Sequence, residues 1–400
     1  MAEETTIELK RAALNHYFQN LNTPQQQAVF HVNGPVLVLA GAGSGKTTAM
    51  IHRIVQMIHF GDGWVQANAS ITKEDAAYLK DYIADKQPAD LERLCSILAV
   101  QPIQPWHILA ITFTNKAANE LRSRLLQAIG EECASMLHAS TFHSACVRIL
   151  RRSISKLGYD SNFTIYDTDD SQRLMKSCIA DADVSEKQFP PRAVLTEISL
   201  AKDRMCSPEY FCIEAGSDYR KMVIGKLYKE YQNRLKSANA LDFDDLIYKT
   251  VELLESFPEE LEYYQNRFRY IMVDEYQDTN HAQFRLVQLL SQKHQNLCVV
   301  GDDDQSIYRF RGATIENILN FEKQFQNAVV IRLEQNYRST KTILEAANDV
   351  IAHNAGRKEK TLWTDLEDGK KIIWYKAVDE TDESRFVAEK IEKEVQNGAS

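Results

Sequence analysis

A glycine-rich segment near the N-terminus has the residue types and spacing that bind nucleotide phosphates. It reads AGAGSGKT and follows the apolar run GPVLVLA at 34–40. Glycines let backbone N–H groups approach a phosphate, and a helix that begins at the loop directs its positive end at the same anion. In such a loop the lysine reaches the β- and γ-phosphates and the threonine hydroxyl ligates Mg²⁺. The predicted ATP- and Mg²⁺-binding segment comprises Ala40, Gly41, Ala42, Gly43, Ser44, Gly45, Lys46 and Thr47.

Two adjacent carboxylates at the end of a second apolar run could supply the hydrolytic chemistry. Asp274 and Glu275 close the run RYIMVDE at 269–275. We expect Asp274 to hold Mg²⁺, usually through water, and Glu275 to orient and deprotonate the attacking water. An acidic pair at a strand end is by itself more often a solvated surface, and a glycine-rich loop is by itself sometimes only a turn. Together they predict an ATP-hydrolysing site.

Parallel strands must position these two motifs. Short apolar runs bounded by polar or turn residues recur along the chain, and they predict buried strands. A segment from Thr47 to Phe60 has apolar residues on one helical face. Alternation of strand and helix predicts an open α/β sheet with ligands at the carboxyl ends of its strands. The predicted strands lie within 34–40, 107–114, 269–275, 296–304 and 328–335.

Two segments interrupt this alternation. Residues 150–235 are charged and helix-patterned, which predicts an inserted helical domain. Residues 61–105 carry glycine, proline and acidic residues between two predicted strands, which favours a surface insertion over core.

Composition sets broad limits on the class of protein. The chain has 400 residues and a formal net charge of −9, so a protein that coats nucleic acid is disfavoured, whereas a motor needs positive potential only along one groove. No run approaches the roughly 20 apolar residues of a membrane span. The first residues lack the layout of a signal peptide, so we expect a cytoplasmic location without membrane contact. The seven scattered cysteines predict reduced, mostly structural thiols.

The motifs along the chain resemble those of the UvrD/Rep/PcrA family of superfamily 1 DNA helicases, in the family's order. The resemblance implies a P-loop NTPase with a RecA-like parallel sheet and an inserted α-helical domain. It rests on LNTPQQQAV (21–29), AGAGSGKT (40–47), AITFTNKAANEL (110–121), STFHSACVRILRR (140–152), ALDFDDLI (240–247), VDEYQDTN (273–280), VGDDDQSIYRFRGA (300–313) and LEQNYRST (333–340).

The resemblance assigns roles around the nucleotide. Gln25 is similar to the glutamine that reads the adenine edge, and Tyr337 to the ring that stacks on adenine. Gln305 is similar to the residue that senses the γ-phosphate. Arg338 resembles an arginine finger, a type of residue that is worth roughly 10³–10⁵ in rate where it has been measured. The implied catalytic set is Lys46, Glu275, Gln305, Arg311 and Arg338.

The resemblance also implies a path for single-stranded DNA. Aromatic rings next to polar groups suit this task, because every base has a face on which a ring can stack. Each ring taken singly is more often a core residue. Family members move 3′ to 5′ and act on single-stranded DNA and on junctions of duplex with single strands, with partners in repair or replication. The implied DNA contacts are Phe113, Thr114, Asn115, His143, Phe243, Tyr308 and Phe310.

The resemblance divides the chain into three parts. Residues 1–149 and 236–330 are expected to form the first RecA-like ATPase domain, 150–235 the helical insertion, and 331–400 an incomplete start of the second RecA-like domain. The family's later motifs lie outside these 400 residues. Two alternatives to an ATP-dependent helicase follow. One is a small-molecule kinase, which would not explain GDDDQSIYRFRGA; the other is a fragment that binds nucleotide and DNA without unwinding.

Overall fold

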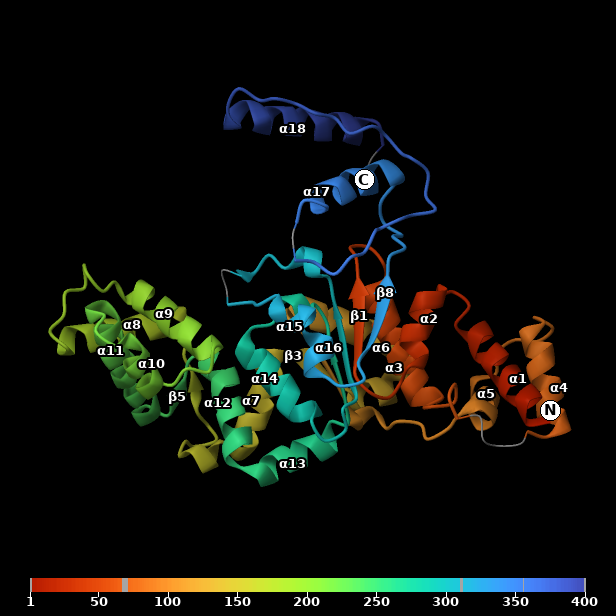
Figure 1. The fold of residues 1–400 in the computed structure, drawn as a ribbon, viewed down its shortest axis with the longest axis horizontal. Helices are drawn as coiled ribbons and strands as arrows, with labels where there is room; N and C mark the ends of the chain where they lie inside the picture. Colours follow the sequence, from red (N-terminus) through yellow and green to blue (C-terminus); the bar gives the residue numbers. More distant parts are fainter. Residues whose placement is uncertain (1, 67–70, 310–311, 355, 399–400) are drawn as a thin grey trace.

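A parallel sheet of six strands forms the centre of the protein, in the order β3-β2-β6-β7-β1-β8 (Figure 1). The computed structural model describes residues 2–66, 71–309, 312–354 and 356–398. The family's implied DNA contact Phe310 and the implied catalytic Arg311 lie outside these residues. The strands are β1 Val36–Ala40, β2 Ile108–Thr112, β3 His138–Thr141, β6 Tyr270–Val273, β7 Leu297–Gly301 and β8 Val329–Leu333.

The five strands predicted from apolar runs are all present in this sheet, which confirms the predicted α/β class. Alternate residues of β1 face opposite sides, so Val36 and Val38 pack in one core while Leu37 and Leu39 pack in the other. Both faces are covered, and for this reason the strands read as continuous apolar runs. The edge strand β3 was not predicted, because its sequence HAST is short and mostly polar.

Helices cover each face of the sheet. One face carries the N-terminal helices and α3, which begins at the phosphate loop; these are α1 Ala2–Tyr17, α2 Thr23–Phe30, α3 Lys46–His59, α4 Lys73–Ile83, α5 Leu91–Leu98 and α6 Asn115–Met136. The opposite face carries α7 Phe142–Ser153, α12 Phe243–Ser256, α13 Pro258–Arg267, α14 His281–Ser291, α15 Glu316–Leu319 and α16 Phe321–Gln324. Helices α4 and α5 belong to the predicted surface insertion. Helix α4 packs against α1, and Leu79 of α4 and Leu94 of α5 are fully buried in the core on this face of the sheet.

A group of four helices lies to one side of the sheet and has its own core (Figure 1). The helices are α8 Thr168–Asp181, α9 Pro191–Asp203, α10 Pro208–Ala215 and α11 Tyr219–Ser237. A two-stranded parallel sheet, β4 Thr164–Ile165 and β5 Ala240–Leu241, lies where the chain enters and leaves this group. The predicted boundary at residue 150 falls within α7, whose buried residues pack with the central sheet.

The remaining segment, 331–400, begins in β8 at the edge of the main sheet. Its helices α17 Lys341–Ile351 and α18 Glu380–Gln396 lie away from the sheet (Figure 1). Several of its large apolar side chains are open to solvent, and Trp374 and Val378 are 81% and 91% exposed. Within the residues described, no helix is both long and apolar enough to cross a membrane.

Candidate nucleotide site and adjoining groove

The phosphate loop connects β1 to α3 through two glycines with left-handed backbone. Gly43 has φ 67° and Gly45 has φ 82°, and Gly45 is the N-cap residue of α3. A side chain at Gly45 would lie 2.5 Å from Nε2 of Gln25. Glycine is therefore required here both by backbone conformation and by space. The loop leaves the first N–H groups of α3 available to an anion.

Gln25 contacts this loop through its side chain. It is the third residue of α2, and its side-chain oxygen accepts a hydrogen bond from the backbone of Asn22 at 3.1 Å, while the Asn22 side chain accepts from the Gln25 backbone at 2.9 Å. This reciprocal cap fixes the glutamine. Its Nε2 donates to the carbonyl of Ser44 at 3.0 Å, and the residue is 3% exposed. Gln25 thus supports the loop whatever else it contacts.

Lys46 and the two carboxylates after β6 meet at the carboxyl end of the sheet. Nζ of Lys46 lies 3.0 Å from Oε2 of Glu275. Glu275 has φ 49°, an uncommon value for a residue with a side chain, and such strain of about 1–3 kcal/mol tends to persist at functional sites. Burial, and next the Glu275 charge, raise the pKa of Asp274 to about 6.

The donors at this point suit a magnesium ion. The Asp274 carboxylate is 8% exposed, and its hydrogen-bond partner among the described residues is the Glu275 N–H at 3.0 Å. Thr47 lines the same groove, so a hydroxyl and a carboxylate oxygen are both offered. Mg²⁺ prefers oxygen ligands and usually keeps several waters, so two protein donors are sufficient beside phosphates. Thr47 and Asp274 therefore fit the predicted ion.

The segment after β8 folds back over the phosphate loop. The Asn336 side chain donates to the Ala42 carbonyl at 2.6 Å, and the Tyr337 N–H donates to the Gly43 carbonyl at 3.0 Å. The Tyr337 hydroxyl accepts a hydrogen bond from the side chain of Asn22 at 2.8 Å, and Asn22 is the residue that caps α2 together with Gln25. Arg338 is exposed, and within the described part of the chain its guanidinium has no hydrogen bond or ion pair. The structure thus brings Tyr337 and Arg338 to the mouth of the phosphate site.

Gln305 follows three consecutive aspartates at the end of β7. It lies in a short 3-10 turn, Asp303–Gln305, and its amide nitrogen donates a short hydrogen bond to Asp302. The backbone N–H of Asp302 donates to Oε1 of Gln277 at 2.9 Å, and Gln277 Nε2 donates to Oε2 of Glu275 at 3.0 Å. Gln305 is therefore linked to Glu275 through Asp302 and Gln277.

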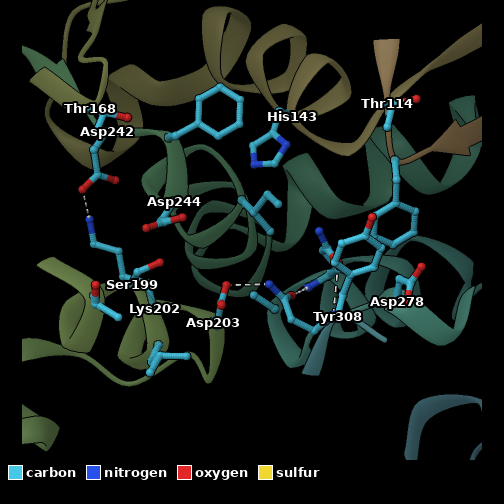
Figure 2. A pocket seen from close by; sticks show the side chains of 18 of the residues that line it. Thr114, His143, Thr168, Ser199, Lys202, Asp203, Asp242, Asp244, Asp278 and Tyr308 are labelled. Atoms are coloured by element: carbon cyan, nitrogen blue, oxygen red, sulfur yellow. Dashed lines mark hydrogen bonds and ion pairs between the residues drawn. The ribbon is translucent and has the colours of Figure 1, made fainter. Parts of the chain in front are cut away.

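A groove of about 1680 Å³ opens beside this site, between the sheet and the four-helix group (Figure 2). It is lined by Thr47, Asp274, Glu275 and Gln305 at one end. Most of the predicted DNA contacts line it as well, namely Phe113, Thr114, His143, Phe243 and Tyr308. Asn115 begins α6 beside Thr114 and is not among the lining residues.

The rings in the groove come from different elements. His143 of α7 and Phe243 of α12 lie 4.1 Å apart between ring centroids, with the ring planes tilted by 32°. Phe243 is 57% exposed and Tyr308 is 40% exposed, so both offer ring surface to a ligand. Burial lowers the pKa of His143 to about 4, so its ring is neutral at pH 7. Phe113 is partly buried and packs edge-on against Phe142, so it is the most core-like of the set.

A buried ion cluster joins the four-helix group to α12 at the floor of the groove. Nζ of Lys202 lies 2.6 Å from Asp242 and 2.9 Å from Asp245, and its side chain is 1% exposed. Nearby, Asn280 donates to Asp203 (Figure 2). Burial, and then the charge of Asp244, raise the pKa of Asp203 to about 7. This pairing fixes the position of α9 relative to the sheet.

Several residues at the site were not predicted from the sequence. Gln277 is 1% exposed and lies between Glu275 and Asp302, while Asn336 is 2% exposed and holds the phosphate loop. Both lie within the motifs VDEYQDTN and LEQNYRST, and membership of these motifs could have indicated that they belong to the site. Lys202 and Asp203, which line the groove, lie outside those motifs and had no comparable signal.

Two family models match the chain. The model described as UvrD/REP helicase N-terminal domain matches residues 21–68 and 91–326. The model described as UvrD-like helicase C-terminal domain matches residues 331–400. The gap in the first match contains α4. A parallel sheet with a phosphate loop after β1 and an acidic pair after β6 defines a P-loop nucleotide-binding protein.

The curated relatives are similar along nearly the whole chain. ATP-dependent DNA helicase PcrA of Bacillus subtilis is 47% identical over 377 residues, which are 94% of this chain and 45% of the relative. The proteins of the same name from Staphylococcus epidermidis and Staphylococcus aureus are each 46% identical, over 96% and 97% of this chain and 47% of each relative. The chain spans about half the length of these relatives. It belongs to the UvrD/REP helicase family.

Proposed function

We propose that this protein is the ATP-binding part of a DNA helicase that couples ATP hydrolysis to 3′-to-5′ movement along single-stranded DNA. The observation that carries the proposal is the continuity of the groove. Thr47, Asp274 and Glu275 line the same cavity as His143, Phe243 and Tyr308. A strand lying on the rings would therefore share one cavity with the nucleotide. Its relatives named ATP-dependent DNA helicases support this assignment.

The chain's own residues divide the chemistry of ATP hydrolysis. The phosphate loop and Lys46 bind the phosphates, and this releases Glu275 from its 3.0 Å contact with Lys46 so that it can accept a proton from water. A bound Mg²⁺, held by Thr47 and Asp274, supplies positive charge beside the phosphates. The guanidinium of Arg338 has no hydrogen bond or ion pair with the described residues, so it is available to stabilise the negative charge that develops on the phosphate during hydrolysis. Gln305 reports the γ-phosphate through Asp302, and Arg311 completes the proposed catalytic set.

The proposed strand path uses stacking more than charge. Phe243, Tyr308 and Phe310 are the proposed base platforms, with Phe113, Thr114, Asn115 and His143 along the border. Each base–aromatic stack is worth roughly 1–3 kcal/mol and depends little on sequence. The proposed substrates are single-stranded DNA and duplex junctions, and the proposed setting is repair or replication in the cytoplasm.

A DNA-stimulated ATPase assay tests the proposal. Phosphate release is measured with Mg²⁺ and ATP, without and with oligo-dT. We expect oligo-dT to raise the rate, with weak stimulation in residues 1–400. A rate that is indifferent to DNA would favour a kinase-like enzyme. Tight nucleotide and DNA binding without turnover would favour the alternative of a binding fragment without unwinding activity.

A further inference from the structure

Lys360 is a buried cation that the proposed chemistry does not use. It lies in the segment after α17, and its side chain is 1% exposed. Nζ lies 2.8 Å from Asp302 and 2.7 Å from Asp304, and it also contacts Asp303. Burial alone would lower the pKa of this lysine, but the three carboxylates outweigh burial and raise it. Lys360 is therefore charged at neutral pH and offsets part of the negative charge of the three aspartates that precede Gln305.

Two neighbours of Lys360 reinforce this contact. Arg357 binds both oxygens of Asp304 in a fork, at 2.7 and 2.6 Å. The backbone N–H of Lys358 donates to Asp303 at 2.7 Å. The side chain of Lys358 points elsewhere and pairs with Glu322. The segment 357–360, which belongs to the part matched by the C-terminal family model, is thus clamped onto the end of β7.

A continuous series of contacts, through side chains and the backbone N–H of Asp302, runs from this clamp to the phosphate loop. Lys360 pairs with Asp302, and the Asp302 N–H donates to Gln277 at 2.9 Å. Gln277 donates to Glu275 at 3.0 Å, and Glu275 pairs with Lys46 at 3.0 Å. A Cβ at position 301 would lie 2.7 Å from Oε1 of Gln277, so glycine at this position leaves space for the Gln277 side chain. Each link is a direct contact, and the middle of the series is buried.

We propose that Lys360 is a positioning residue for the γ-phosphate end of the nucleotide site, and that the series through Asp302 and Gln277 couples the segment 357–360 to Glu275. This inference rests on the proposed function and goes further by naming the route between the two parts of the chain. A γ-phosphate that attracts Lys46 removes this lysine from Oε2 of Glu275. Gln277 also donates to Oε2, so its hydrogen bond to Glu275 no longer competes with Lys46. A change in the Gln277–Glu275 hydrogen bond is passed on to Asp302, whose side chain binds both Gln305 and Lys360.

The test compares the affinities of the 400-residue chain for Mg²⁺-ADP and for a non-hydrolysable Mg²⁺-ATP analogue, both measured by calorimetry. The ratio of the two dissociation constants isolates the γ-phosphate. We expect Lys360→Met to reduce this ratio about fivefold or more, in the range typical of coupled sites, with ADP affinity nearly unchanged. Gln277→Leu interrupts the series in the middle and should reduce the ratio similarly. The double variant should show no further loss, because contacts in one network are not additive.

Lys358→Met is the matched control, because it removes the same charge two residues away without touching the aspartates by its side chain. Its ratio should equal that of the unmodified chain. Lys360→Arg, which keeps the charge, should restore part of the ratio. If Lys360→Met is unstable, Gln277→Leu and the arginine variant carry the same comparison.

The outcomes separate the inference from the proposed function. A folded Lys360→Met that keeps the original ratio, or effects of Lys360→Met and Gln277→Leu that simply multiply, would overturn the coupling. An unmodified chain that binds ADP and the ATP analogue equally would also overturn it, with nucleotide binding intact. A chain that binds neither nucleotide would instead refute the proposed function.

Discussion

Replacing Lys202 should destabilise the protein, and the contacts of this lysine determine by how much. Replacing it by methionine keeps most of the packing of its stem but leaves Asp242 and Asp245 without their cation. Breaking a buried pair by removing one partner costs about 3–5 kcal/mol. Asp242 keeps a hydrogen bond from Tyr231 at 3.0 Å, and Asp245 keeps one from Gln232 at 2.9 Å. We therefore expect Lys202→Met to lower the free energy of unfolding by about 3 kcal/mol, the lower end of that range. This is a large part of a typical free energy of unfolding of about 5–15 kcal/mol.

The penalty of Lys202→Met should depend on pH. Burial, and then Asp242, already raise the pKa of Asp245 to about 7, and loss of the lysine removes a charge that lowers it. A carboxyl whose folded pKa is raised destabilises the fold above its unfolded pKa of about 4, where unfolding releases its proton. The difference between Lys202→Met and the unmodified protein should therefore be largest above pH 7 and shrink as the pH falls toward 4.

Urea unfolding followed by circular dichroism at pH 5 and pH 8 measures both effects of Lys202→Met. Lys293→Met is a matched control, because Lys293 pairs with Glu262 at 3.0 Å on the surface, and such pairs contribute about 0–1 kcal/mol. A Lys202→Met variant within 1 kcal/mol of the unmodified protein at pH 8 would refute the reasoning that the cluster holds α9 against α12. An equal loss in the Lys293 variant would point to net charge instead.

Three further predictions concern the site. Glu275→Gln should keep ATP affinity and lose most turnover, whereas Lys46→Ala should weaken binding itself; calorimetry beside phosphate release checks this, and equal loss of affinity in both would contradict the roles. Phe243→Ala should weaken oligo-dT binding by roughly 1–3 kcal/mol, measured by fluorescence anisotropy, while Tyr219→Ala, 68% exposed outside the groove, should not. Asp203→Asn should stabilise the protein at pH 8 and have little effect near pH 4, because burial raises the pKa of Asp203; thermal scans at both pH values would show no such difference if its carboxyl ionises normally.

The sheet could be predicted because its strands are buried on both faces and therefore read as apolar runs. The edge strand β3 could not, since its residues His138 to Thr141 are few and mostly polar, whereas the other edge strand, β8, has the apolar sequence VVIRL and was predicted. The helix after the phosphate loop was also predictable. Its apolar face packs on the sheet, and the structure places it at Lys46–His59 against a predicted Thr47 to Phe60.

The site residues that belong to short sequence motifs could be predicted from the sequence. Lys46 and Glu275 are far apart in sequence, and the carboxyl ends of parallel strands bring them within 3.0 Å. Lys360 is different, because a lysine in a charged segment such as GRKEK reads as solvent-exposed surface. Only tertiary structure shows that three carboxylates surround it. Residues that act through other residues carry little signal of their own in a single sequence.

The charge of the groove bears on how this acidic protein could bind the proposed DNA strand. Among the described lining residues carboxylates outnumber cations, and one of the cations, Lys202, is already neutralised by Asp242 and Asp245. A strand that turned its phosphates toward this floor would meet repulsion, whereas bases are uncharged and can stack on Phe243 and Tyr308. Asp203, with its raised pKa, retains a proton at neutral pH more readily than an ordinary carboxyl and so reduces the repulsion further. The net charge of −9, which by itself counts against nucleic-acid binding, is thus compatible with a groove that recognises bases and leaves phosphates facing solvent.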